Sequence, residues 1–215
     1  TKSNVVVPAN NKNKPYVPIT KTVNLEKLEL NYSKRDFYEE EFFFKNNSLI
    51  IDELPDFKSK NYTVGENENF YVIDFSDSNN KRKSVETELI GKSNNSLVFL
   101  DTAYLTDANK ATVLNLQDEF DTEKLPILKD FYSNEFDINN NQKVTIVFAD
   151  FHDASYLGYF TPVDFWNDDY AQSVGTRSNE GDIIYINAAL LRDNNYIGMR
   201  DTLTHEFQHL LWHYN

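Results

Sequence analysis

None of the 215 residues of this chain is a cysteine, so its fold must be held together without disulfide bonds. The same absence excludes metal sites built from thiolate ligands. A chain of this length can bury a sizeable core, as one large domain or as two small ones. Stability must therefore come from packed apolar side chains, and the pattern of apolar residues becomes the main guide to the fold.

The charge balance narrows the range of partners. The chain has 34 acidic and 21 basic side chains, which gives a formal net charge of -13. A nucleic-acid surface needs clustered basic residues to replace phosphate counterions, so we expect no nucleic-acid partner. No apolar run approaches the roughly 18 residues that cross a bilayer, so we expect no transmembrane segment. Because the chain begins at Thr1 and shows no signal peptide, we interpret it as a processed or recombinant form, with a cytosolic protein as the alternative.

The first 105 residues favour β-structure after an extended start. Residues 1–20 contain three prolines among several Asn and Lys residues, which predicts an extended leader or linker. From 21 to 105 the apolar residues come in runs of strand length, at 42–44, 49–51, 70–73 and 97–100. Polar turns separate these runs, and residues 81–83, Lys-Arg-Lys, extend one such turn as a solvated loop. We therefore predict a small β-rich N-terminal domain at 21–105.

Residues 106–215 mix helix and strand patterns. Between 107 and 133 apolar residues recur at three- and four-residue spacing, which predicts helix. Pro126 falls in the first turn of the second half of this stretch, where its missing N–H costs least. Strands are predicted at 144–148 and 183–186, and a helix runs from about Tyr196 to the end of the chain. The predicted fold class is α+β, with residues 106–215 as a second domain.

The closing helix contains the pattern His-Glu-x-x-His, at His205, Glu206 and His209. Positions i and i+4 lie on one face of a helix, so both imidazoles can reach one Zn²⁺ at about 2.0–2.1 Å. Glu206 then lies beside the open position of the metal, where it can take a proton from water and pass it to a leaving amine. Leu203 and Phe207 belong to an apolar back that a buried active-site helix needs. Two solvated histidines on a polar helix face are the alternative.

Two nearby residues leave further alternatives open. Asp201, four residues before His205, could accept a hydrogen bond from that ring and fix its tautomer. An acidic residue is also favoured early in a helix by the dipole, and we favour this explanation. His213 lies one turn past His209 and could be a third ligand or contact substrate, although we favour an exposed or core histidine.

Residues 204–210, Thr-His-Glu-Phe-Gln-His-Leu, resemble the active-site helix of hyicolysin-type bacterial zinc metallopeptidases. Similarities to that family run back to about Gly65, at residues 70–73, 97–101, 141–146, 158–160 and 184–187. The resemblance implies a zincin-like catalytic domain at 106–215, endopeptidase activity on proteins or peptides, and a secreted or cell-surface location. It carries zinc-ligand roles onto His205 and His209, and the role of general base onto Glu206.

The resemblance also implies a third zinc ligand, a glutamate on a following helix. The astacin and matrix-protease pattern is not met, because Trp212 and Asn215 stand where it needs a glycine and a third histidine. We therefore expect the third ligand beyond Asn215 and a catalytic domain that is incomplete at its C-terminus. The upstream carboxylates Asp153, Asp168 and Asp169 could substitute, but their spacing singles out none of them.

Two further segments carry weaker hypotheses. Residues 183–187 could be an exposed strand edge on which a peptide substrate docks, and an ordinary core strand fits the same pattern equally well. Asp137, Asn139 and Asn141 place oxygen side chains at alternate positions, as at the start of a Ca²⁺ loop. Gln142 replaces the turn glycine and Phe148 replaces the closing glutamate, so an Asn-rich turn is the favoured explanation.

A surface adhesin or binding module with a degenerate metal helix is the alternative function. Its support is the aromatic, acidic composition and the predicted β-rich N-terminal region. Zinc content separates the two classes of protein, because a binding module should purify without stoichiometric metal.

Overall fold

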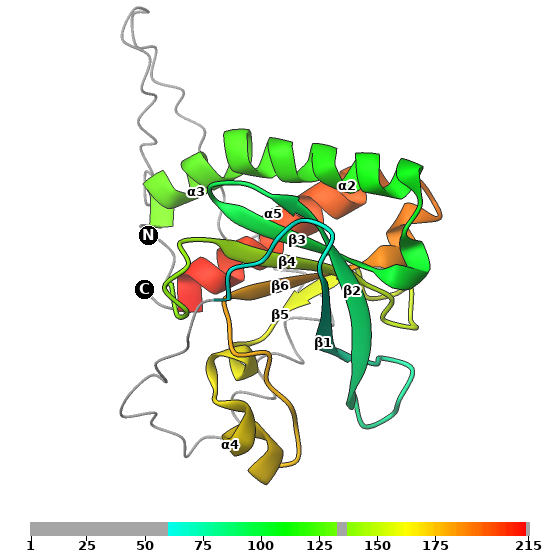
Figure 1. The fold of residues 1–215 in the computed structure, drawn as a ribbon, viewed down its shortest axis with the longest axis vertical. Coiled ribbons are helices and arrows are strands. Elements are labelled where there is room, and N and C mark those ends of the chain that lie inside the picture. The colour runs from blue at the N-terminus through cyan, green and yellow to red at the C-terminus, as the bar shows by residue number, and fades with distance from the viewer. Residues whose placement is uncertain (1–59, 133–136, 214–215) are drawn as a thin grey trace, which may run out of the picture.

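A computed structural model describes residues 60–132 and 137–213, which form a mixed sheet with helices packed on it (Figure 1). The strands are β1 (Asn67–Ile73), β2 (Arg82–Lys92), β3 (Ser96–Asp101), β4 (Val144–Ala149), β5 (Gly158–Phe160) and β6 (Ile183–Asn187). The α-helices are α2 (Asp107–Glu119), α3 (Leu125–Tyr132), α4 (Asp168–Ser173) and α5 (Tyr196–His213). A π-helical segment, η3 (Phe120–Lys124), joins α2 to α3, and short 3-10 turns are η2 (Thr102–Tyr104), η4 (Pro162–Phe165) and η5 (Ala188–Leu191). The predicted α+β class is confirmed.

The six strands form one sheet in the order β1-β2-β3-β4-β6-β5. β3, β4 and β6 are parallel neighbours, whereas β1, β2 and β5 join the sheet in antiparallel pairs. The apolar runs predicted as strands at 70–73, 97–100, 144–148 and 183–186 lie in β1, β3, β4 and β6. The predicted leader and the strands predicted at 42–44 and 49–51 lie outside the described residues.

β3 and β4 lie on opposite sides of the predicted domain boundary at residues 105 and 106, yet they pair directly in the sheet. The division of the chain into domains stays a prediction. Any such division has to take into account that one sheet continues across residues 105 and 106. Helix α2 packs closely on β2 at Gly91. A Cβ atom at Gly91 would clash with the side chains of Gln117 and Leu114, so a larger residue there would have to displace both.

Two separate cores cover the two faces of the sheet. One lies under α2, α3 and α5, where Val98, Ile146 and Ile184 of the sheet meet Leu116 and Phe207 of the helices. The other is built from strand residues and the adjoining Phe151, with every strand of the sheet contributing to it. Its members are Phe70, Val72, Val85, Leu89, Leu97, Phe99, Val147, Ala149, Phe151, Tyr159, Ile183 and Tyr185. A strand-built core of this kind requires the sheet to curl around it.

The curl brings the two edge strands of the sheet into contact. The backbone N–H of Ile73 in β1 donates to the hydroxyl of Tyr159 in β5, at 3.0 Å. The side-chain amide of Asn179 bonds both backbone groups of Tyr71, accepting from its N–H and donating to its carbonyl. The outer edge of β1 is therefore covered at Tyr71 and Ile73. The opposite edge of the sheet is β5.

A buried ion pair reinforces the curl. Arg82, the first residue of β2, donates to Asp164 in η4 at 2.6 Å, and their side chains are 3% and 1% exposed. Asp164 also accepts hydrogen bonds from the Tyr185 hydroxyl and the Asn179 backbone N–H. The prediction that residues 81–83 form a solvated loop is wrong for Arg82, because its partner is 82 residues away and no local pattern reveals it.

The long helix over the sheet and the closing helix agree with the sequence predictions. α2, η3 and α3 run as one continuous rod across the sheet, where helix was predicted at 107–133 (Figure 1). α5 spans Tyr196–His213, as predicted from its apolar spacing. No helix among residues 60–132 and 137–213 is both long and apolar enough to cross a membrane.

The proposed docking edge at Ile183–Asn187 is wrong. These residues form β6, which pairs with β4 on one side and with β5 on the other. All five are buried. β6 is therefore a core strand with both of its edges occupied, and the strand at the nearby edge of the sheet is β5.

Candidate metal centre

Helix α5 places the candidate metal ligands by burying its opposite side. Leu203, Phe207 and Leu210 are at most 2% exposed and belong to the core beneath the helices. His205 and His209 are half-buried, one turn apart on another face of the helix. The spacing of apolar and polar residues thus fixes the rotation of α5 about its own axis. That rotation determines where the two imidazoles lie.

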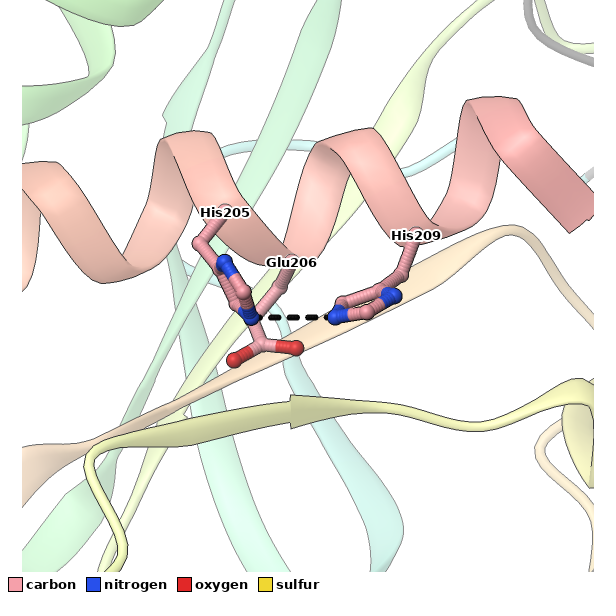
Figure 2. Close-up of side chains that lie close together, drawn as sticks. All are labelled: His205, Glu206 and His209. Atoms are coloured by element: carbon pink, nitrogen blue, oxygen red, sulfur yellow. Dashed lines mark hydrogen bonds between the residues drawn. The ribbon is translucent and has the colours of Figure 1, made fainter. Parts of the chain in front are cut away.

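The two imidazoles lie side by side. Nε2 of His205 is 3.0 Å from Nε2 of His209, and the ring planes are 85° apart with centroids 4.6 Å apart. Glu206 projects from the same side of α5, as Figure 2 shows, and it is fully buried. One candidate ligand atom from each of the three residues lies within 4.8 Å of the others. Within the described residues, this is the group of His, Asp and Glu side chains with the proximity that a metal ion needs.

These residues fit a zinc ion. Two nitrogen ligands at 2.0–2.1 Å from zinc, at a tetrahedral angle, lie about 3.3 Å apart. The observed separation of 3.0 Å differs from this by a few tenths of an ångström, which a small change in side-chain torsion angle covers. Nitrogen donors and a carboxylate also match the ligand preferences of zinc, since the chain has no thiolate to offer.

The upstream carboxylates considered as a third ligand have other roles in the structure. Asp168 accepts hydrogen bonds from the Arg177 guanidinium at 2.6 Å and from a backbone N–H. The Arg177 hydrogen bonds are the main reason that the pKa of Asp168 is lowered. Asp153 accepts from the backbone N–H of Ser155, and Asp169 is exposed on α4. None of the three joins the group around His205 within the described residues.

Asp201 and His213 also take structural positions. The Asp201 carboxylate pairs with the neighbouring Arg200 at 2.8 Å and is well exposed. The dipole explanation favoured from the sequence is wrong, because α5 begins at Tyr196 and has no acidic residue in its first turn. His213 packs its ring on Phe165, with centroids 5.6 Å apart and planes 19° apart, and it also meets Phe160. Burial among these rings lowers the pKa of His213.

The edge strand β5 lies along α5 and forms the near wall of the site (Figure 2). Gly158 at its start abuts Thr202, and a Cβ atom there would lie 2.5 Å from the Thr202 methyl group. Phe160 at its end meets His213. The sequence did not predict this strand, because three residues are too few to show a period. The family resemblance at 158–160 was the available signal for it.

The Asn-rich loop does not support a Ca²⁺ site. The Asp137 carboxylate accepts from the backbone N–H groups of Asn141 and Gln142, at 2.9 and 2.8 Å. Asn139 also accepts from the Asn141 N–H, and Asn141 accepts from Lys143. The side-chain oxygens that would bind a cation instead accept backbone hydrogen bonds within the loop. These bonds stabilise a turn, as the Asn-rich composition favours.

The chain is similar to the neutral metalloprotease ShpI of Staphylococcus hyicus, with 26% identity over 153 residues. The match covers 66% of this chain and 32% of that protein, so the chain spans about a third of the length of this relative. No protein-family model matches the chain. The similarity is distant and partial, and it supports a metallopeptidase family for this chain.

Proposed function

We propose that this chain carries two metal ligands and the general base of a zinc-dependent endopeptidase, within a zincin-like catalytic domain. The observation that supports this most strongly is the 3.0 Å separation of the His205 and His209 nitrogens beside buried Glu206. The similarity to a metalloprotease supports the same reaction class. A secreted or cell-surface location goes with the proposal, as it does for the family that the helix resembles.

In this proposal His205 and His209 hold the zinc through Nε2. The metal, when bound, polarises the substrate carbonyl and makes water a stronger acid. Glu206 takes a proton from the attacking water and passes it to the nitrogen of the leaving amine. Because the carboxylate is fully buried on α5, its position relative to the two histidines is fixed before substrate arrives. A catalytic zinc site has three protein ligands, so the third would lie outside the described residues.

The edge strand β5 is the proposed docking site for substrate. It pairs with β6 on one side and lies along α5, the helix that carries the three site residues. A peptide that adds to its other side would be held by main-chain hydrogen bonds, which tolerate varied side chains. The substrates are accordingly proteins or peptides, and β5 replaces Ile183–Asn187 as the element that receives them.

Two measurements on the protein test the proposal. Metal analysis of the purified protein, in a form that includes the expected third ligand, should find zinc in a one-to-one ratio, whereas a binding module with a degenerate helix should purify without it. The isosteric substitution Glu206→Gln should keep the zinc and lower peptide cleavage by at least about 100-fold, because a general base contributes 10²–10⁴-fold. Equal cleavage by Glu206→Gln and wild type would refute the assigned mechanism.

A further inference from the structure

The helix that covers α5 contains a π turn with an identifiable cause. Residues Phe120–Lys124 are π-helical between two α-helices, and the N–H of Leu125 donates to the carbonyl of Phe120, five residues back. Pro126 follows at once. In an α-helix its ring would collide with the carbonyl of Thr122, four residues earlier, and it has no N–H to donate. The wider turn immediately before Pro126 moves those carbonyls apart, so the rod continues without a break.

The π turn also changes which side of the rod faces the core. Before it, the buried residues Val113, Leu116 and Phe120 follow the spacing of an α-helix. After it, burial resumes at Leu125, five residues past Phe120, and continues at Leu128. A regular α-helix would have turned residue 124, a lysine, toward the core instead. The extra residue thus lets both halves of the rod bury their apolar sides.

Phe120, the first residue of the π turn, lies directly behind the candidate metal centre. Its ring meets Phe207 edge to face, with centroids 5.1 Å apart and planes 85° apart, and both side chains are at most 1% exposed. Phe207 lies between His205 and His209 in the sequence, in the helical turn that sets their spacing. The Phe120 ring therefore supports, from behind, the one turn of α5 that carries both imidazoles.

Polar contacts lock the same junction. Glu119, next to Phe120, accepts from the Tyr196 hydroxyl at 2.8 Å, at the start of α5. Thr122 donates its hydroxyl to the carbonyl of Asp118, across the widened turn. On the sheet side, Ser96 donates to Asp121 at 3.1 Å. The π turn is thus fastened to α5 and to β3 at once.

We propose that Phe120 is a positioning residue for the metal centre, acting through Phe207 on the turn between His205 and His209. This inference rests on the proposed zinc function. Metal ligands tolerate errors of only about 0.2 Å in distance, so a looser turn costs affinity. Supporting groups around metal ligands typically change metal affinity by 10–100-fold when they are altered. The change in zinc affinity caused by loss of the Phe120 ring should fall at the lower end of that range, because the ring acts through one intervening side chain, Phe207.

The experiment compares Phe120→Leu with a matched control, Phe99→Leu. Phe99 is fully buried and makes edge contacts with Phe70 and Tyr62, but it lies in the strand-built core on the opposite face of the sheet from α5. Both substitutions remove a buried ring and should lower the thermal unfolding temperature to a similar extent. The readout is the zinc dissociation constant, measured by competition with a chelator on the form of the protein that includes the expected third ligand.

Phe120→Leu should raise the zinc dissociation constant about tenfold, while Phe99→Leu should leave it within about twofold of wild type. If Phe120→Leu does not fold, Phe120→Met keeps most of the volume and should show the same contrast at about threefold. Unchanged zinc binding in the Phe120 variants, with a wild type that binds zinc, overturns the positioning role alone. A wild type that binds no zinc overturns the proposed function and this inference together.

Discussion

Nε2 of His205 and Nε2 of His209 lie 3.0 Å apart, a distance at which one imidazole donates a hydrogen bond to the other. The contact needs one ring to carry its proton on Nε2 and the other to carry it on Nδ1. A metal ion that binds both nitrogens must replace this bond and displace that proton. The pair is thus close enough for a shared ligand, and its geometry is set by the one-turn spacing on α5.

Removal of either histidine should abolish tight metal binding. His209→Ala should raise the zinc dissociation constant by more than about 100-fold, since loss of a ligand exceeds the 10–100-fold effect of altered supporting groups. The control is His152→Asn, because His152 lies away from α5 and is half-exposed beside Asp74. Its φ of 59° is one that asparagine tolerates. Chelator competition should show wild-type affinity for this control, and equal losses in both variants would contradict the assigned ligands.

The contact between β5 and α5 leads to a second prediction. A Cβ atom at Gly158 would lie 2.5 Å from the Thr202 methyl group and 2.7 Å from the Tyr185 carbonyl oxygen. Gly158→Ala should therefore destabilise the protein by about 1–3 kcal/mol, the usual cost of overpacking. Thr202→Ser removes the methyl group but leaves the carbonyl in place, so the double variant should recover only part of the loss. Chemical denaturation of the four proteins measures this coupling, and full recovery would show that the backbone contact is harmless.

The sequence predicted the parts of the fold that local patterns specify. Continuous apolar runs predicted β1, β3, β4 and β6. In β3, β4 and β6 the run reflects burial of both strand faces, whereas the edge strand β1 is buried only at Phe70 and Val72. β2 was missed, although Val85, Thr87 and Leu89 are buried at alternate positions and carry a two-residue period. The charged residues between them, such as Glu86 and Glu88, obscured that signal.

Only the candidate site residues that lie on a single helix, α5, could be predicted from the sequence. His205, Glu206 and His209 follow from spacing along α5, because a helix fixes which residues share a face. Phe120 and β5, which flank that helix, are distant in sequence and meet it only through the fold. The π turn that presents Phe120 was likewise missed, although Pro126 in a helical pattern signals a local departure from α-helix.

The buried ion pair gives a third prediction. Arg82→Met should destabilise the protein by about 3–5 kcal/mol, because it leaves the buried Asp164 carboxylate without its cation. Burial alone would lower the pKa of Arg82, but the neighbouring Asp164 more than offsets this and raises it. Lys110→Met is the control, since Lys110 pairs with Glu88 at the same 2.6 Å but is 35% exposed. It should cost less than about 1 kcal/mol in denaturant unfolding. Similar costs for the two variants would show that the buried pair has no special role.

The anchor at the start of α5 should make stability depend on pH in a defined way. The hydrogen bond from Tyr196 is the main cause that lowers the pKa of Glu119, with Lys124 also contributing. A carboxylate whose pKa is lowered in the folded state stabilises the protein above its unfolded pKa of about 4.3, and that stability is lost as the pH falls through the folded pKa. Burial and Glu119 raise the pKa of Tyr196 to about 12, so the phenol stays protonated at neutral pH.

Tyr196→Phe should therefore cost about 1 kcal/mol near pH 7, the lower part of the range for hydrogen bonds of this kind because the pair is partly exposed. The difference from wild type should begin to shrink as the pH falls below the unfolded pKa of about 4.3, and it should vanish below the lowered pKa of folded Glu119, where Glu119 is protonated in both folded proteins. Denaturant unfolding from pH 3 to pH 7 measures it. Tyr170→Phe is the control, since the Tyr170 hydroxyl makes no hydrogen bond within the described residues, although its ring packs on Trp166. A gap between wild type and Tyr196→Phe that stays constant over this range would show that the Glu119 charge does not drive the contact.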